Sequence, residues 1–162
     1  FEKFSKLAPF HYEGAFYAGA LAQALGDDAA AIAAYERAIA LYPAMQGAIY
    51  NLGNVYLKRG LHDRAAGLYS RALEINPCFA EAVNNRGNAS ALSGRHEEAD
   101  RDYLRALSLK PDYADALFNL AVNAQRTGRM GDARRWLKRT LGVDPKYAPA
   151  RDLAATLGVR HP

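Results

Sequence analysis

Six asparagines have the residue type and the spacing best suited to chemistry in this sequence. Some of them are separated by three or four residues, which is one turn of a helix, and others by 34 residues, an interval that recurs along the chain. Asparagine stabilises a helix by about 0.5 kcal/mol less than alanine does, so six asparagines on predicted helices indicate that these residues serve a function. The six are Asn51, Asn54, Asn84, Asn85, Asn88 and Asn119.

A side-chain amide donates and accepts hydrogen bonds at the same time. An extended peptide backbone presents alternate N–H and C=O groups, so a row of amides on one helix face can bind it. We therefore predict that these asparagines line a peptide-binding groove. Apolar residues such as Leu52 and Leu117 fall on the opposite side of the same helices and are expected in the core. The alternative is that the asparagines form an ordinary solvated face.

Aromatic and basic side chains extend this predicted face. Helical phase places Phe16, Tyr17, Tyr50 and Phe118 on it, where they would form side-chain pockets or else pack against the adjacent repeat. Lys58 and Arg126 occupy equivalent places near the ends of predicted helices and could attract a carboxylate.

Enzymatic and metal chemistry find little support in the sequence. His62 and His96 are separated by the same long interval and lie beside acidic residues, but packed helices are roughly 10 Å apart. A shared zinc ion needs bonds of about 2 Å. Cys78 has no histidine partner in a motif, and GRMGDA lacks the lysine of a phosphate-binding loop. We expect no enzyme, no cofactor and no bound metal.

A basic cluster near the C-terminus raises the alternative of a nucleic-acid or acidic partner. Trp136 lies among its residues, and basic side chains with an aromatic can follow a phosphate backbone. Four of these basic residues, Arg134, Arg135, Lys138 and Arg139, also fit the outward face of a helix, so we do not expect nucleic acid to bind. The cluster comprises Arg126, Arg129, Arg134, Arg135, Lys138 and Arg139.

The elements that position these side chains follow a 34-residue period. Prolines recur at Pro9, Pro43, Pro77, Pro111 and Pro145. Glycines, small alanines and tyrosines recur with the same period. Each unit reads as a first helix that stops at a glycine and a second helix that starts with acidic residues and ends before the proline. The recurring sets are Gly26, Gly60, Gly94 and Gly128; Ala31, Ala65, Ala99 and Ala133; Tyr35, Tyr69 and Tyr103 with Leu137 in the fourth place; and Gly19, Gly53 and Gly87 with Ala121 in the fourth place.

The pattern resembles the tetratricopeptide repeat. The second repeat matches the family best. It has the family's small, aromatic and proline residues at Gly53, Tyr56, Ala65, Tyr69, Ala72 and Pro77. The resemblance implies an all-α, right-handed superhelical solenoid of antiparallel helix pairs, whose first helices line a concave groove that binds peptide segments. The asparagine spacing is similar to that of family members that hold a peptide backbone. We predict one domain, 1–162, with repeats at 12–45, 46–79, 80–113 and 114–147 and a closing helix at 148–158.

Length and composition agree with a scaffold protein. The chain has 162 residues, a formal net charge of +4 and one cysteine, so no internal disulfide can form. No stretch approaches the roughly 20 apolar residues of a membrane span. We expect a protein or peptide partner and a cytoplasmic location, with the periplasm as the alternative.

Two further alternatives concern assembly and context. Residues 1–11 are predicted to end a preceding repeat, because Pro9 falls in phase with the later prolines. Phe1 and Phe4 would then lack a covering helix and could promote a homo-oligomer. The chain could equally be the repeat portion of a larger enzyme.

Overall fold

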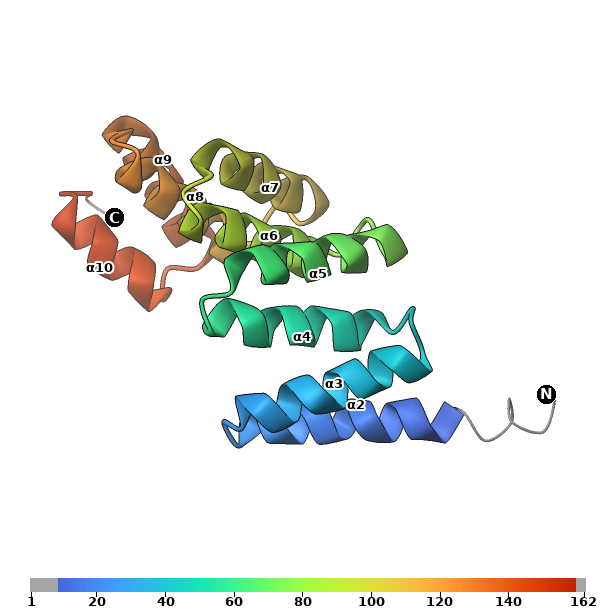
Figure 1. Ribbon diagram of the computed structural model, residues 1–162. Coiled ribbons are helices and arrows are strands. Elements are labelled where there is room, and N and C mark those ends of the chain that lie inside the picture. The colour runs from blue at the N-terminus through green and yellow to red at the C-terminus, as the bar shows by residue number, and fades with distance from the viewer. Residues whose placement is uncertain (1–8, 160–162) are drawn as a thin grey trace. The chain divides into compact units, whose positions relative to one another are not determined.

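The structure is a computed structural model that describes residues 9–159 and divides into two compact units, Phe1–Pro77 and Cys78–Pro162. Every regular element in the described residues is a helix, which confirms the all-α prediction (Figure 1). The first unit contains α2 (Pro9–Ala24), α3 (Asp28–Leu41), α4 (Gln46–Lys58) and α5 (His62–Ile75). The second contains α6 (Ala80–Leu92), α7 (His96–Leu109), α8 (Ala114–Arg126), α9 (Met130–Val143) and α10 (Ala148–Thr156).

From the end of α2 onward, the predicted starts and stops of the helices are confirmed. Gly60 follows α4 with a φ of +74°, a left-handed conformation that glycine adopts without a steric cost, and the equivalent glycines behave alike. Asp27 caps α3 by accepting a 2.9 Å hydrogen bond from the Ala30 N–H. Each second helix ends before its in-phase proline, as α5 does before Pro77.

The first unit is held together by tyrosines packed against glycines. Tyr35 and Tyr69 are fully buried. A Cβ atom added to Gly53 would lie 2.8 Å from Cε1 of Tyr69, so only glycine lets α4 and α5 approach this closely. Helix α3 packs against both α2 and α4, and the core between them includes Ala31 and Leu52.

The second unit repeats this arrangement and ends in a small apolar cluster. Helices α6 and α8 are the first helices of their repeats, and they are in contact with each other. A groove lined by first helices requires such a contact. Leu137 takes the tyrosine position in the last pair and is fully buried. Together with Leu141, Ala150 and Ala154 it forms the cluster that joins α9 to α10.

One polar pair replaces apolar contacts inside the second unit. The guanidinium of Arg86 donates two hydrogen bonds to the Asp102 carboxylate, of 2.8 Å from Nε and 2.6 Å from Nη2. One repeat earlier the same two positions hold Leu52 and Leu68. The hydrogen bonds to Asp102 raise the pKa of Arg86 above its ordinary value, so the guanidinium stays charged.

The N-terminal boundary differs from the prediction. Helix α2 already begins at Pro9, earlier than the in-phase start that α4 shows after Pro43. Proline is accepted in the first turn of a helix because its missing N–H would have no partner there. Phe1 and Phe4 lie outside the described residues, so the predicted oligomer surface stays a prediction. None of the described helices is both long and apolar enough to cross a membrane.

Candidate functional site

Four of the predicted asparagines form one hydrogen-bond network on the first helices of the second unit. Asn119 on α8 donates a 3.0 Å bond from Nδ2 to Oδ1 of Asn84 on α6. Asn84 in turn donates to Oδ1 of Asn85 at 3.2 Å, and Asn88 approaches the same oxygen at 3.5 Å. Asn85, Asn88 and Asn119 are half-buried. The structure therefore brings these four amides together.

Asn84 is placed differently from the prediction. Its exposed fraction is 2%, so its side chain does not face a groove. It stands at the position that Phe16, Tyr50 and Phe118 occupy in the other repeats, and its amide reaches α8 between the helices. Asn84 thus orients Asn85 and Asn119 and is not itself a surface contact.

The later asparagine of each pair is tethered to the tyrosine of its own repeat. The Tyr69 hydroxyl donates a 2.8 Å hydrogen bond to Oδ1 of Asn54, and Tyr103 donates one of 2.9 Å to Asn88. Burial raises the pKa of both Tyr35 and Tyr103, and the nearby Asn51 side chain opposes the rise for Tyr35, whose hydroxyl donates a 2.8 Å hydrogen bond to Oε1 of Gln23. The amides of Asn54 and Asn88 are therefore held in fixed orientations by buried tyrosines.

The predicted aromatic pockets are occupied by contacts within the fold. The Phe16 ring lies 6.0 Å from that of Tyr35, and the Tyr50 ring lies 5.8 Å from that of Tyr69. The Phe118 ring lies 5.4 Å from that of Tyr147. These distances favour the packing alternative for Phe16, Tyr50 and Phe118, whereas Tyr17 is 68% exposed.

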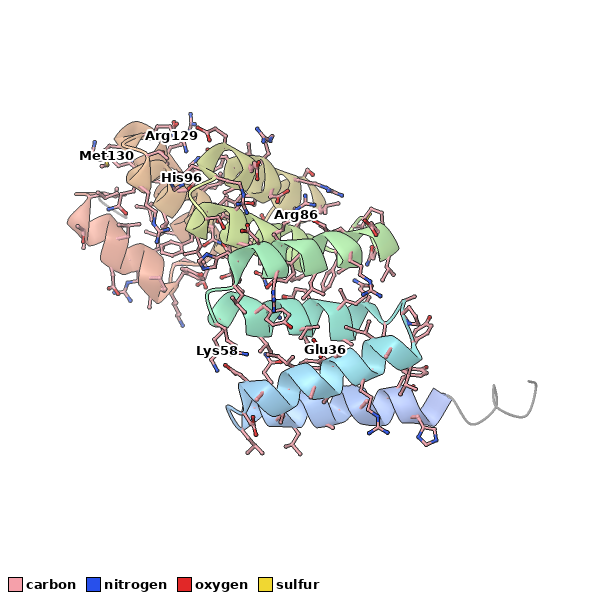
Figure 2. The ribbon with its side chains drawn as sticks, viewed as in Figure 1. Glu36, Lys58, Arg86, His96, Arg129 and Met130 are labelled. Atoms are coloured by element: carbon pink, nitrogen blue, oxygen red, sulfur yellow. The ribbon has the colours of Figure 1, made fainter. Side chains whose placement is uncertain are left out.

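The two predicted carboxylate-attracting cations have different surroundings. Lys58, at the end of α4, forms a 2.9 Å ion pair with Asp28 at the start of α3 (Figure 2). Arg126 is exposed at the end of α8, and its charge acts to lower the pKa of Tyr103. Both cations are exposed, but only Lys58 forms an ion pair within residues 9–159.

Intramolecular partners engage most of the basic cluster. Arg135 pairs with Asp132 at 2.9 Å, and Arg129 pairs with Asp100 at 2.6 Å. Arg134 donates to the Leu157 carbonyl at 3.1 Å, and Arg139 donates to the Pro111 carbonyl at 3.4 Å. These contacts support the interpretation that Arg134, Arg135 and Arg139 lie on the outward face of α9, whereas Arg126 and Arg129 precede that helix.

Asn123 is a polar junction that the sequence reasoning missed. It is 1% exposed and donates from Nδ2 to the His96 carbonyl at 2.9 Å and to Asp100 at 2.7 Å. Its Oδ1 lies 2.7 Å from Nδ1 of His96, which explains a polar residue at that position of α7 without a metal. The sequence did contain a signal for this junction. The position of Asn123 holds the apolar residues Leu21 and Val55 in the first two repeats. Among the described residues no three His, Cys, Asp or Glu side chains gather to hold a metal ion.

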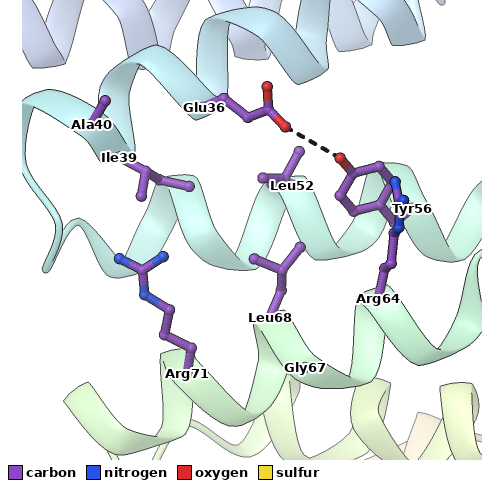
Figure 3. Close-up of a pocket in the computed structure, with 9 residues that line it drawn as sticks. All are labelled: Glu36, Ile39, Ala40, Leu52, Tyr56, Arg64, Gly67, Leu68 and Arg71. Atoms are coloured by element: carbon purple, nitrogen blue, oxygen red, sulfur yellow. Dashed lines mark hydrogen bonds between the residues drawn. The ribbon is translucent and has the colours of Figure 1, made fainter.

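A pocket in the first unit was also not predicted. It has a volume of about 520 Å³ and lies over α4 between α3 and α5, with Leu52, Leu68 and Ile39 among its lining residues (Figure 3). The Tyr56 hydroxyl donates a 3.3 Å hydrogen bond to Glu36 at its rim. Two repeats after Leu68, the equivalent position in the second unit holds Trp136, which fills more space.

Comparison with protein-family models places the repeats. Models described as tetratricopeptide repeat match residues 13–44 and 48–77, and one described as TPR repeat matches residues 87–128. The chain belongs to the tetratricopeptide-repeat family. Tetratricopeptide repeats form protein-interaction scaffolds, and this chain is a scaffold of that class.

Solved structures agree with the tetratricopeptide fold. MamA is 22% identical over 91% of this chain and 88% of its own, with a TM-score of 0.80. Cut9, solved in an APC/C hetero-tetramer with Hcn1, gives a TM-score of 0.83 at 20% identity over 90% of this chain and 30% of its own. The first TPR of Spaghetti (RPAP3), bound to the HSP90 peptide SRMEEVD, gives 0.66 at 20% identity over 70% of this chain and 90% of its own. No curated protein sequence matches the chain.

Proposed function

We propose that this tetratricopeptide domain is a non-enzymatic adaptor that binds an extended peptide segment of another protein on its first helices. The observation that carries the proposal is the amide network of α6 and α8, in which half-buried Asn85 and Asn119 are held by buried Asn84. An amide fixed in advance loses little side-chain entropy when it binds, which favours affinity.

The atoms available for backbone recognition are those that the network does not use. Asn119 donates one Nδ2 hydrogen to Asn84, and its Oδ1 accepts no hydrogen bond from the described residues. It can therefore accept from a peptide N–H. Asn51 on α4, one repeat before Asn85, is the equivalent residue and is half-buried in the same way.

A structure with a peptide on a similar fold supports the class of ligand. The RPAP3 repeat domain was solved with a peptide that contains two glutamates and ends in aspartate. Exposed Arg126 offers a cation at the end of α8 for a carboxylate of such a peptide. No catalytic group enters this proposal.

Affinity capture with the full chain, followed by mass spectrometry, tests the proposal. Proteins retained by the wild type but lost by an Asn85→Ala/Asn119→Ala variant are expected. An Arg134→Gln/Arg139→Gln variant is the matched control, since it alters the outward face of α9, and it should retain the same proteins. Circular dichroism of each variant checks that the helices remain. Equal retention by both variants would reject the asparagine site.

A further inference from the structure

The pocket over α4 combines an apolar floor with a charged rim, and we call it the α3–α5 pocket after the helices on either side of it. Leu52 and Leu68 lie in its middle (Figure 3). Tyr56 and Arg64 lie at one end, and Arg71 lies at the other. Its volume of about 520 Å³ falls within the range of about 300–1,000 Å³ that is usual for ligand sites. Such walls suit a group that is mainly apolar and carries few polar atoms.

In the second unit an indole ring stands at the equivalent place. Trp136 follows a leucine of the pocket floor by two repeats, and its ring centre lies 5.8 Å from Cζ of Arg139. Arg139 donates a hydrogen bond to the carbonyl of Pro111, just after α7. Arg71 donates one of 2.7 Å to the carbonyl of Pro43, just after α3. The two guanidinium groups are thus held at the same place in their repeats, and an aromatic ring that enters the α3–α5 pocket would lie against Arg71.

A missing side chain leaves the α3–α5 pocket open. Gly67 lines it in the middle of α5, and a Cβ atom there would meet no other atom within 4 Å. The equivalent residues of the next two repeats are Arg101 and Arg135. The Arg135 side chain lies over the indole, with Cζ 5.6 Å from the centre of the Trp136 ring. Glycine is a poor helix former, and packing within the chain does not require it here. Its effect is to leave room for a group from outside.

The rim offers a hydrogen-bond acceptor that the fold uses only in part. Oε1 of Glu36 accepts a 3.3 Å hydrogen bond from the Tyr56 hydroxyl, and its Oε2 accepts none from the described residues. An indole N–H donates a hydrogen bond and accepts none, so a carboxylate oxygen suits it. The face of an indole ring also attracts a guanidinium group such as that of Arg71. The pocket therefore provides a partner for both the N–H and the ring of an indole.

The exposed rim favours a side chain carried by a protein over a free small molecule. Glu36, Ala40, Arg64 and Gly67 are all exposed, whereas a pocket for a small molecule normally buries most of the ligand surface. In a protein complex, the partner surface around the anchoring side chain supplies the missing cover. Tryptophan is enriched among the few residues that contribute most of the binding energy in such interfaces.

We propose that the α3–α5 pocket binds a tryptophan side chain of a partner protein. The indole ring lies on Leu52 and Leu68 with its face toward Arg71, and its N–H donates to the Glu36 carboxylate. A second copy of this chain does not supply the anchor, because its single tryptophan, Trp136, is packed against the cluster that joins α9 to α10. None of the lining residues is an asparagine of the proposed peptide site, so the two proposals stand or fall separately.

Three capped amino acids serve as probes for the full chain. N-acetyltryptophanamide should bind with a dissociation constant of roughly 1 mM, as expected for so small a molecule. In a nuclear magnetic resonance titration, the amide shifts should centre on Leu52, Gly67 and Leu68. The benzothienylalanine analogue, in which sulfur replaces the N–H, should bind about fivefold more weakly because it donates no hydrogen bond. N-acetylleucinamide lacks the ring as well and should bind about tenfold more weakly.

Gly67→Arg closes the pocket with the side chain that later repeats carry at this position. It should weaken binding of the tryptophan probe at least about tenfold, because the space above Leu52 and Leu68 is filled. Gly142→Arg is the matched control, since Gly142 also lies on a second helix with no atom within 4 Å of an added Cβ. It should leave affinity unchanged. The Asn85→Ala/Asn119→Ala variant should also bind this probe as the wild type does, which separates the pocket from the peptide site.

Glu36→Ala tests the hydrogen bond from the indole. It should weaken binding of the tryptophan probe about fivefold and leave binding of the benzothienylalanine probe unchanged, because only the first probe donates to the carboxylate. An equal loss for both probes would mean that Glu36 acts on the shape of the pocket, and it would contradict the proposed orientation of the ring.

Three results would overturn the proposal. The first is binding of the tryptophan probe that Gly67→Arg does not weaken. Urea unfolding checks that this variant folds, and Leu68→Trp, which copies Trp136, is a second way to fill the pocket. Another is equal affinity for the leucine and tryptophan probes, which would reject the indole as the ligand. Free indole that binds more tightly than the capped tryptophan would assign the pocket to a small molecule instead of a partner protein.

Discussion

Glycine and tyrosine side by side determine the spacing within the first three helix pairs. A Cβ on Gly19, Gly53 or Gly87 would lie 2.7–2.8 Å from the ring of the tyrosine on the second helix of the same pair. Tyr69 cannot move away, because it is fully buried and its hydroxyl is bonded to Asn54. The tyrosine therefore fixes both the helix distance and the orientation of an asparagine amide.

Two glycine substitutions should have opposite effects on stability. Gly53→Ala forces a methyl group into the Tyr69 ring and should lower the free energy of unfolding by about 1–3 kcal/mol. Gly67→Ala, in the exposed middle of α5, meets no atom within 4 Å. It should raise the free energy of unfolding by up to about 1 kcal/mol through helix propensity. Urea unfolding of both variants measures the difference, and a stabilised Gly53→Ala protein would contradict the packing described for Tyr69.

The pair of α6 and α7 differs from its neighbours in carrying a charged contact. Arg86 and Asp102 side chains are 26% and 12% exposed, and their equivalents in the first unit are Leu52 and Leu68. Arg86 and Asp102 depend on each other, because removal of one partner leaves the other charge largely buried without its main contact.

A double-mutant cycle on this helix pair should be strongly non-additive. Arg86→Leu leaves the Asp102 carboxylate in the protein interior and should cost about 3 kcal/mol. The double variant Arg86→Leu/Asp102→Leu restores an apolar pair and should have a stability close to that of the wild type or above it. The free energies of unfolding in urea supply the cycle. Additive losses in the double variant would show that the ion pair is not the relevant contact.

Buried tyrosines make the helix pairs sensitive to alkaline pH. Burial raises the pKa of Tyr103 in the folded protein, so the neutral hydroxyl is favoured there. Its contribution to stability is fully present below the unfolded pKa of about 10 and is lost as the pH rises toward the folded value. The free energy of unfolding should fall by about 1.4 kcal/mol per pH unit above about pH 10 for this group.

Tyr103→Phe isolates that effect. The variant loses the hydrogen bond to Asn88, so it should be less stable than the wild type at neutral pH. Its free energy of unfolding should then fall less steeply between about pH 9 and about pH 11, because one titrating group is gone. Parallel pH profiles for the two proteins would contradict the assignment.

At the scale of the whole molecule, the sequence predicted the helix pairs well because their signals are local and repeated. Gly60 needs a positive φ, and Pro77 cannot continue a helix, so the boundaries can be read from single positions. The burial of Asn84, the junction at Asn123 and the Arg86–Asp102 pair were not predicted. Each depends on a contact between different helices, and helical phase does not show which neighbour a polar side chain meets. The sequence did contain one sign of the ion pair. Two positions that hold leucine in the second repeat hold Arg86 and Asp102 in the third.

The most direct test of the account is the affinity of the chain for one captured peptide, measured by titration at two salt concentrations. We predict that Asn85→Ala/Asn119→Ala weakens binding by about thirtyfold, at about 1 kcal/mol for each lost hydrogen bond, at both salt concentrations. Arg134→Gln/Arg139→Gln should change affinity little and mainly alter its salt dependence. Unchanged binding by the asparagine variant, with a steep loss in the arginine variant, would contradict the account.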